Sequence, residues 1–154
     1  MTVMTTAGTV LGISATVPAT FTKTAFEALT FTEIGEITEI GGDVGRVYNV
    51  VNHNPISTRA TVKMKGSYQS GSLALTIAID RADAGQVLAQ AALNSDAKYS
   101  FKMELQDGSI LYFQGLVTSF PINPGGVDSV TAGTINVEIT SDKDGNDFVE
   151  VPAL

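Results

Sequence analysis

The sequence predicts a mainly β protein of one domain, with a single helix packed against its strands. The chain has 154 residues, which fits one hydrophobic core. β-branched residues and glycine-containing turns recur along it, and this composition favours a sheet over a helix bundle. Several segments also alternate apolar and polar residues with the period of two that is typical of strands. The predicted strands are residues 8–17, 31–40, 60–68, 72–80, 98–106, 109–118 and 134–140.

The second half of the chain has the clearest strand pattern. Residues 98–106 alternate and are followed by Asp107-Gly108, which is a strong signal for a two-residue hairpin. Residues 109–118 are apolar on both faces, so we expect them to form a central return strand. Residues 134–140 alternate again, and their side chains predicted to face inward are Ile135, Val137 and Ile139.

One helix is predicted over residues 84–93. Asp80 or Asp83 can cap it, and Asp83 with Gln86 three residues later resembles a capping box. Four apolar residues fall at positions i, i+3, i+4 and i+7. They form one stripe, which we expect to cover a face or an edge of the sheet. The four are Ala84, Val87, Leu88 and Ala91.

The first half of the chain has weaker signals. Isoleucine recurs every three residues in 33–40, which a β-bulge at Gly35 would reconcile with a strand. Residues 41–55 contain three glycines and end in Asn52-His53-Asn54-Pro55, so they predict a long polar loop between two strands. Loops of this length are usually functional or disordered. We expect one domain, 1–154, with a flexible N-terminal arm at about 1–7 and a flexible C-terminal tail at about 142–154.

Charge and composition exclude several classes of protein. The formal net charge is −7 with a pI near 4.5, and an acidic surface repels nucleic-acid phosphates. The chain has no cysteine, which excludes disulfides and thiol chemistry. Its start lacks the pattern of a signal peptide, and no apolar run approaches the roughly 18 residues of a membrane helix. We expect a soluble protein that works or assembles in the cytoplasm.

No constellation of catalytic or ligand-binding residues is recognisable. His53 is the only histidine, so neither a zinc site of the usual kind nor a triad with signature spacing can be assembled. Residues 142–153 lack the final glutamate of a calcium loop, and residues 41–45 lack the lysine of a phosphate loop. Glu33, Glu36 and Glu39 could pair as catalytic carboxylates, but a solvated acidic face is the favoured interpretation. The sequence therefore predicts neither an enzyme nor a bound cofactor or metal.

Many short motifs, each weak alone, follow one another in a familiar order over about residues 5–141. They are Ile40-Gly41-Gly42, Arg46-Val47-Tyr48-Asn49, His53-Asn54-Pro55, Lys63-Met64-Lys65-Gly66-Ser67-Tyr68, Asp83-Ala84-Gly85-Gln86, Tyr99-Ser100-Phe101-Lys102, Gln106-Asp107-Gly108, Gly125-Gly126-Val127-Asp128 and Glu138-Ile139-Thr140. In their order and spacing they resemble the major tail tube proteins of bacteriophages with long, non-contractile tails.

The resemblance implies a β-sandwich of the barrel-forming tail tube type with a helix outside the barrel. It also implies a structural virion protein that assembles in the host bacterial cytoplasm into stacked hexameric rings. The implied partners are other copies of the chain, the tape measure protein, and the tail tip and tail terminator proteins. DNA would only pass through the tube, and no membrane is involved.

Two sets of residues acquire candidate roles from this resemblance. Acidic side chains that face the lumen would repel DNA and keep it moving, and the candidates are Glu33, Glu36, Glu39 and Glu104. The predicted loop 41–55 would reach a neighbouring ring, and its candidate residues are Gly41, Gly42, Asp43, Gly45, Arg46, Asn52, His53, Asn54 and Pro55.

Two alternatives remain open at this stage. One is the inner tube protein of a contractile tail or injection machine, which belongs to the same group of folds. The other is a virion-associated carbohydrate-binding β-sandwich module. The absence of tryptophan weakens the second alternative, because such a module needs an aromatic ligand face.

Overall fold

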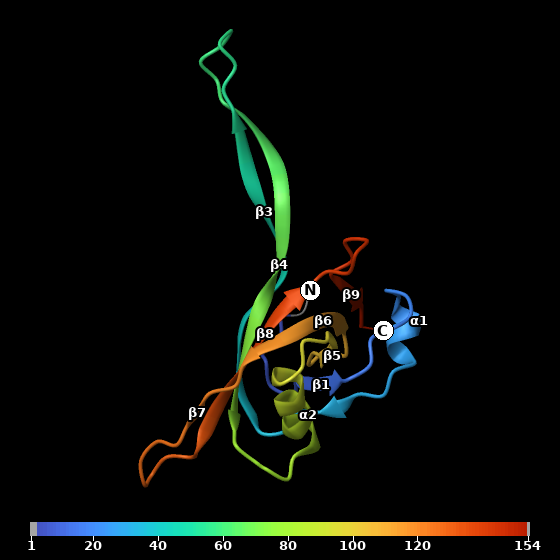
Figure 1. Cartoon of the computed structure of the whole chain (residues 1–154), viewed down its shortest axis with the longest axis vertical. Helices are drawn as coiled ribbons and strands as arrows, with labels where there is room; N and C mark the ends of the chain where they lie inside the picture. Colours follow the sequence, from blue (N-terminus) through green and yellow to red (C-terminus); the bar gives the residue numbers. More distant parts are fainter. Residues whose placement is uncertain (1–2, 154) are drawn as a thin grey trace.

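The strands of this protein form one antiparallel sheet that curls around a single hydrophobic core (Figure 1). The computed structural model describes residues 3–153, so residues 1–2 of the predicted N-terminal arm and Leu154 of the predicted tail lie outside the described residues. The elements are β1 (Val10–Ser14), α1 (Lys23–Glu27), β2 (Thr32–Glu33), β3 (Ile37–His53), β4 (Val62–Ala78), α2 (Ala84–Leu93), β5 (Tyr99–Glu104), β6 (Ile110–Ser119), β7 (Ile122–Asn123), β8 (Ala132–Thr140) and β9 (Phe148–Val151).

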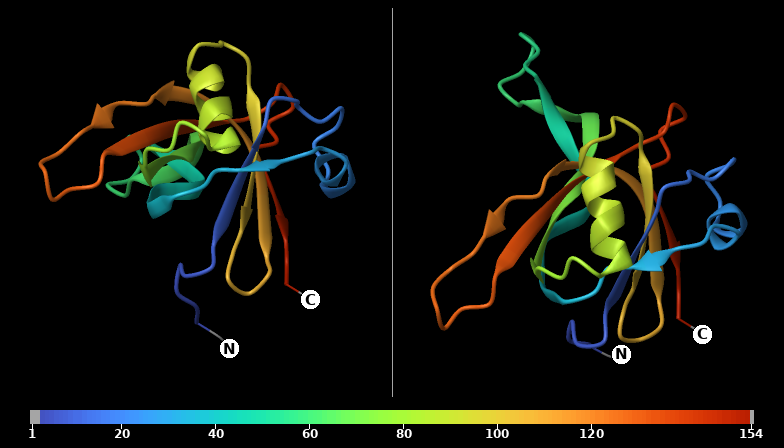
Figure 2. Two further views of the ribbon diagram at one scale, coloured as in Figure 1. Left: turned by 90° about the horizontal axis from the view of Figure 1, so that it is seen from below. Right: turned by 60° about the horizontal axis from the view of Figure 1, so that its bottom comes forward.

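The strand order in the sheet is β2-β1-β5-β6-β8-β4-β3, with β7 paired to β8 and β9 paired to β6. Figure 2 shows β1 and β8 running in clearly different directions, as expected of a strongly twisted sheet. In a β-sandwich, two facing sheets enclose the core. Here a single curved sheet encloses it. The predicted mainly β fold class is confirmed.

The core consists of the inward-facing side chains of β1, β4, β5, β6 and β8, together with one side of α2. Phe101 on β5 and Phe113 on β6 are stacked with ring centroids 5.4 Å apart. Burial of such side chains contributes about 25 cal/mol for each Å² of apolar surface. The predicted inward-facing residues of β8 are buried, namely Ile135, Val137 and Ile139.

The β5–β6 hairpin forms where Asp107-Gly108 predicts it, but its loop has three residues, 106–108, and not the predicted two. The amide of Gly108 donates to the carbonyl of Leu105 at 3.0 Å, and the amide of Leu105 donates to the carbonyl of Ser109 at 2.9 Å. β6 is central, as predicted: β5 pairs with one of its edges, and β8 and β9 share the other. Residues 141–147 leave the sheet between β8 and β9 as a loop.

The helix α2 has the predicted bounds, but it buries a different face from the predicted one. Its buried residues are Gly85, Gln86, Ala89 and Ala92, whereas Ala84, Val87 and Ala91 are exposed and Leu88 is half-buried. Asp83 is the N-cap and accepts a hydrogen bond from the amide of Gln86 at 3.0 Å. The Gln86 side chain does not return to Asp83. It donates to the carbonyls of Ala78 and Gly35, at 2.9 and 3.2 Å. The side of the helix that carries Gln86 therefore faces the sheet.

These contacts of α2 also explain why residues 31–40 are not one strand. The amide of Gly35 donates to the Asp83 carboxylate at 3.0 Å, so the chain leaves the sheet there and β2 and β3 are separate. The predicted β-bulge at Gly35 is therefore wrong. Glu36, the next residue, has a φ of 61°, which is uncommon for a side chain other than glycine.

The predicted loop 41–55 is wrong as secondary structure, because most of it belongs to the 17-residue strand β3. The strands predicted at 60–68 and 72–80 are likewise one strand, β4, and β3 pairs with it along its length. Gly45 lies at an irregularity of register between Val44 and Val47, whereas Gly41 and Gly42 pair regularly with Ala74 and Leu73. Gly71, opposite Val44, has a φ of 95°, and a Cβ there would collide with the backbone of Asp43.

Besides the two-residue strand β7, two further elements were not predicted. β9 lies within the predicted flexible tail 142–154, so that prediction is wrong for residues 148–151. The short helix α1 begins after the N-cap Thr22 and buries Phe26, whose ring stacks on that of Tyr112 with centroids 5.2 Å apart. Both elements are too short to produce a recognisable period in the sequence.

Gly85 offers a test of how α2 is seated. Alanine is about 1 kcal/mol better than glycine in a helix, but a Cβ at Gly85 would collide with the backbone of Glu33 and Ile34. We expect Gly85→Ala to lower the free energy of unfolding by about 1–3 kcal/mol, as overpacking does, in urea denaturation. Gly126→Ala is the control, because nothing lies within 4 Å of its Cβ position; an equal effect of both substitutions would contradict this account.

Candidate assembly surface

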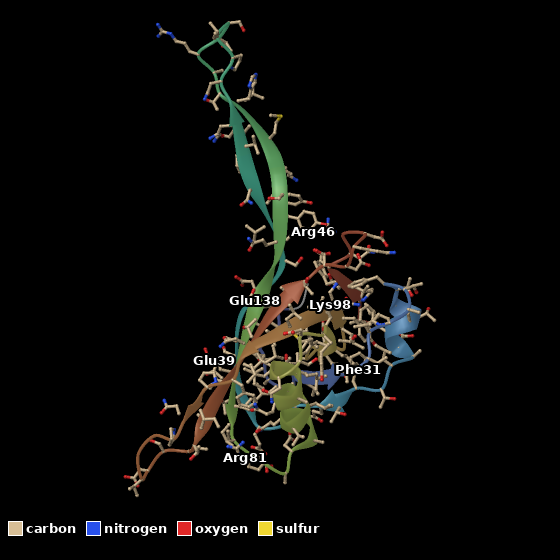
Figure 3. The ribbon with its side chains drawn as sticks, viewed as in Figure 1. Phe31, Glu39, Arg46, Arg81, Lys98 and Glu138 are labelled. Atoms are coloured by element: carbon tan, nitrogen blue, oxygen red, sulfur yellow. The ribbon has the colours of Figure 1, made fainter. Side chains whose placement is uncertain are left out.

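The most prominent feature of the surface is a two-stranded arm formed by the far halves of β3 and β4 (Figures 1 and 3). We define the β3–β4 arm as residues 46–69. Beyond its base it projects away from the body, and a two-stranded ribbon in water is marginally stable without a partner. Exposed apolar side chains gather on it, which is typical of an interaction site. They are Val47, Val50, Val51, Ile56, Val62 and Met64.

The register of the two strands gives the β3–β4 arm two different faces. Val51 lies opposite Met64, and His53 lies opposite Val62, so these pairs form a largely apolar face. On the other face, Val50 lies opposite Lys65 and Asn52 opposite Lys63. This second face also carries aromatic rings: the Lys65 ammonium lies 4.8 Å from the centroid of Tyr48, and the rings of Tyr48 and Tyr68 are 5.1 Å apart.

Charge is sharply segregated between the β3–β4 arm and the rest of the chain. The arm carries four of the nine lysines and arginines, and none of the sixteen aspartates and glutamates lies in it. With histidine neutral, its formal charge is +4, which leaves −11 on the remainder of a chain whose total is −7. The four cations are Arg46, Arg59, Lys63 and Lys65.

The base of the β3–β4 arm is held by the loop 141–147. Arg46 makes a bidentate ion pair with Asp147, Nε to Oδ2 at 2.8 Å and Nη2 to Oδ1 at 3.2 Å. Ser70 on β4 donates to the same carboxylate at 3.1 Å, and the Tyr68 hydroxyl donates to the carbonyl of Gly145 at 2.8 Å. Both strands of the arm are therefore tied to one loop. We call this set of contacts the arm latch.

The electrostatics of the arm latch favour the charged pair. Burial would raise the pKa of Asp147, whose side chain is only 4% exposed, but hydrogen bonds from Arg46 and Ser70 and the charge of Arg46 lower it below its usual value. The same pair raises the pKa of Arg46. Charge-assisted, bidentate contacts are directional, so the latch fixes the direction in which the arm leaves the body.

A second surface lies on the outside of the β3–β4–β8 part of the sheet, at the root of the arm. Cross-strand pairs place Glu138 beside Ser72 and Ser72 beside Asp43, and the row with Glu39 lies on the same face (Figure 3). No lysine or arginine of these three strands lies on this face, and its other side chains are small. The nine residues of this acidic face are Glu39, Gly41, Asp43, Ser72, Ala74, Thr76, Thr134, Asn136 and Glu138.

The four acidic residues predicted to line a lumen do not lie together. Glu39 belongs to the acidic face, whereas Glu36 lies in the link between β2 and β3. Glu33 and Glu104 lie beside Lys102 around a separate groove of about 160 Å³ whose lining includes Phe31. Asp43 and Glu138, which the sequence did not single out for this role, complete the acidic face. Only the pairing of β3 with β4 and β8 brings them near Glu39.

The nine candidate residues for contacts between rings fall along β3 and the tip of the arm. Gly41, Gly42, Asp43 and Gly45 lie at its root, Arg46 is in the arm latch, Asn52 and His53 end β3, and Asn54 and Pro55 begin the tip turn. The sequence missed their partners on β4, Lys63 to Lys65, and the anchor Asp147. Lys63 and Lys65 alternate with Val62 and Met64, which indicates a strand but not one that leaves the body.

A shorter projection lies at the opposite end of the molecule from the β3–β4 arm (Figure 1). We call residues 122–132, from β7 to the start of β8, the short hairpin. It exposes Val127 and Val130 with Ile122, and Asp128 is its one charged residue. Within residues 3–153, no group of three or more histidines, aspartates or glutamates is placed to hold a metal ion, and no helix is long and apolar enough to span a membrane.

No protein-family model matches the sequence, and no curated protein matches it. Solved structures do share its fold. A sheath/tube terminator of an extracellular contractile injection system has a TM-score of 0.67 at 10% identity, with 99% of each chain covered. A chain from the virion of a native gene transfer agent has a TM-score of 0.62 at 12% identity, covering 92% of this chain and 95% of that one. The SPP1 tail tube has a TM-score of 0.59 at 15% identity, covering 84% and 72%.

At these identities the comparisons establish the fold. These structural neighbours include a tail tube and a sheath/tube terminator of a contractile injection system. The chain thus has the fold of tail tube proteins, and the resemblance noted in the sequence is confirmed at that level.

The arm latch can be tested with Asp147→Asn. The substitution removes the ion pair and leaves a poorer partner for Arg46 and Ser70, so we expect the free energy of unfolding to fall by about 1–3 kcal/mol. Amide hydrogen exchange should also become faster at the base of the arm. Asp144→Asn in the same loop is the control, since its exposed side chain makes no hydrogen bond. Equal exchange rates in the two variants would contradict the latch.

The arm latch should also be sensitive to acid. The pKa of Asp147 is lowered in the folded protein. Its contribution to stability is therefore fully present above the unfolded pKa of about 4 and is lost as the pH falls through the lowered value. Urea denaturation across this range should give wild-type and Asp147→Asn stabilities that converge at low pH. A constant difference between the two proteins would contradict the prediction.

Proposed function

We propose that this protein is the structural subunit of a tail tube, in which copies assemble as stacked rings around a hollow bore. The single observation that carries the proposal is the exposed β3–β4 arm, with one apolar and one cationic face, on a chain with the tail tube fold. Beyond its base, the arm projects away from the body of its own copy (Figure 1). In the proposal, it makes the contact between successive rings.

Sixfold rings are part of the proposal. A similar structure, the tail of an empty gene transfer agent particle, is described with C6 symmetry, and it has a TM-score of 0.57 at 12% identity over 82% of this chain and 88% of that one. In a virion tail, the further partners would be the tape measure, tail tip and tail terminator proteins. The role is structural and not enzymatic, and assembly takes place in the host bacterial cytoplasm.

We assign the acidic face to the bore of the tube. It is the uncovered side of the β3–β4–β8 sheet, because the core and α2 lie on the other side. Small side chains with carboxylates and no cations give a surface that repels DNA phosphates and offers nothing for a base to stack on. This assignment retains Glu39 from the four residues predicted in the sequence and adds Asp43 and Glu138.

The inner tube of a contractile tail or injection machine is the second candidate. It is favoured by the sheath/tube terminator and by a chain from the sheath–tube complex of the same kind of injection system, which has a TM-score of 0.59 at 10% identity over 95% of this chain and 88% of that one. The subunit chemistry proposed here is the same in both cases. Co-purification of a sheath protein with native tails distinguishes them.

The proposed function is tested by electron microscopy of purified protein before and after concentration. We expect stacked rings or hollow tubes, and rotational averaging of end views should show six subunits. Tail-tip extract is added in parallel as a source of initiator. A protein that stays monomeric under both conditions would contradict the proposal.

The bore assignment is tested with the triple variant Glu39→Lys, Asp43→Lys and Glu138→Lys. Because cations on this face would attract phosphates, we expect its tubes to retain DNA fragments at low salt and to release them as salt is raised. The control variant Glu27→Lys, Asp96→Lys and Glu150→Lys makes the same charge change at exposed positions outside the acidic face. Equal DNA retention by the two tubes would overturn the assignment.

A further inference from the structure

The two ends of the molecule differ in charge along its longest axis. The β3–β4 arm, with four cations and no acidic residue, forms one end (Figure 1). At the other end lie the start of β3, the loop from β4 to α2 and the short hairpin (Figures 1 and 2). This end exposes three carboxylates, Glu36, Asp80 and Asp128, beside one cation, Arg81. We call it the acidic end.

We propose that the β3–β4 arm of one copy docks, head to tail, on the acidic end of a second copy. This inference rests on the proposed function and names the surface that receives the arm. Lys63 and Lys65 supply the positive charge, and Glu36 and Asp128 supply the negative charge. The occupant is a second copy because the same chain carries both complementary surfaces.

Apolar surface is matched as well as charge. The tip of the arm exposes Ile56 completely, and the apolar face behind it includes Val51 and Met64. The short hairpin exposes Val127 completely, with Val130 beside it. Exposed apolar side chains of this kind gain free energy when they are buried against each other. Opposite charges around them would set the register and exclude a contact of arm with arm, since both arms are cationic.

The position of the two surfaces determines the type of assembly. A contact between different surfaces of identical copies is not saturated by one partner. It leaves an arm at one end and an acidic end at the other, and therefore continues as an open polymer unless it closes into a ring. The arm latch contributes by holding the arm away from its own body, so that it meets another copy. Growth along the long axis follows from the charge distribution of the single chain.

The test uses charge reversal at each end. The arm variant is Lys63→Glu with Lys65→Glu, and the end variant is Glu36→Lys with Asp128→Lys; none of these four side chains makes a hydrogen bond in the structure. Each variant alone places like charges in contact, so we expect the concentration needed for polymer, measured by pelleting and sedimentation velocity, to rise about tenfold or more. The combined variant restores opposite charges and should polymerise close to the wild-type concentration. Wild-type polymer should weaken as salt is raised.

Two controls separate the docking contact from overall charge. Lys23→Glu with Lys143→Glu changes the net charge by as much as the arm variant, but outside the arm, and should polymerise like wild type. The arm variant combined with Glu27→Lys and Glu150→Lys has the net charge of the combined variant and should not be rescued.

If wild type forms tubes and the arm variant forms them equally well, or the combined variant fails, the docking contact is overturned while the proposed function stands. If wild type does not self-associate under any condition, both are overturned.

Discussion

The continuous pairing of β3 with β4 is the interaction on which the rest of the structure depends. Inside the body, the two strands close the core with Ile40, Leu73 and Leu75. Beyond Gly71 the same ladder continues with no core on either side and becomes the β3–β4 arm. Backbone hydrogen bonds alone stabilise such a ribbon poorly. The body therefore stabilises the arm, both through the continuous pairing of β3 with β4 and through the arm latch.

The distribution of charge opposes uncontrolled pairing of the β3–β4 arm with other copies of the arm. A long exposed ribbon with apolar side chains is a risk for uncontrolled pairing. Lysines at alternate positions of β4 and the absence of any acidic residue on the arm make arm-to-arm contact repulsive. The acidic remainder repels itself in the same way. Charge therefore favours contacts between unlike parts of two copies, as the proposed assembly requires.

The sequence was informative wherever a strand has one buried face. β5, β6 and β8 alternate because one side meets the core, and Asp107-Gly108 marks the turn between the first two. The prediction of a loop at residues 41–55 is wrong because most of this part of β3 is exposed on both faces. A strand without a buried face has no period to detect, and its glycines and asparagines then resemble a loop. What makes it a strand is its partner β4, which single-sequence periodicity does not reveal.

The candidate surface was predictable only in part for a related reason. Arg46 and the glutamates are visible as charges, but the arm latch joins residues 101 positions apart, and the acidic face joins three strands. The helix α2 shows the limit of an apolar stripe as a guide. Its buried side includes Gly85, which lets the helix lie close to the backbone of Glu33 and Ile34, and Gln86, which makes hydrogen bonds. Neither residue contributes to an apolar stripe in the sequence.

The distance along the chain between Arg46 and Asp147 has a consequence for the order of events on the ribosome. The arm is complete in sequence once Gln69 has been added, but the residue that anchors it follows Arg46 by 101 positions. Because synthesis proceeds from the N-terminus, a nascent chain carries an unanchored arm until β8 and the loop after it have emerged. A chain released early cannot present its arm in the fixed direction. The direction of the arm is thus fixed only once the loop 141–147 has emerged and Asp147 can pair with Arg46.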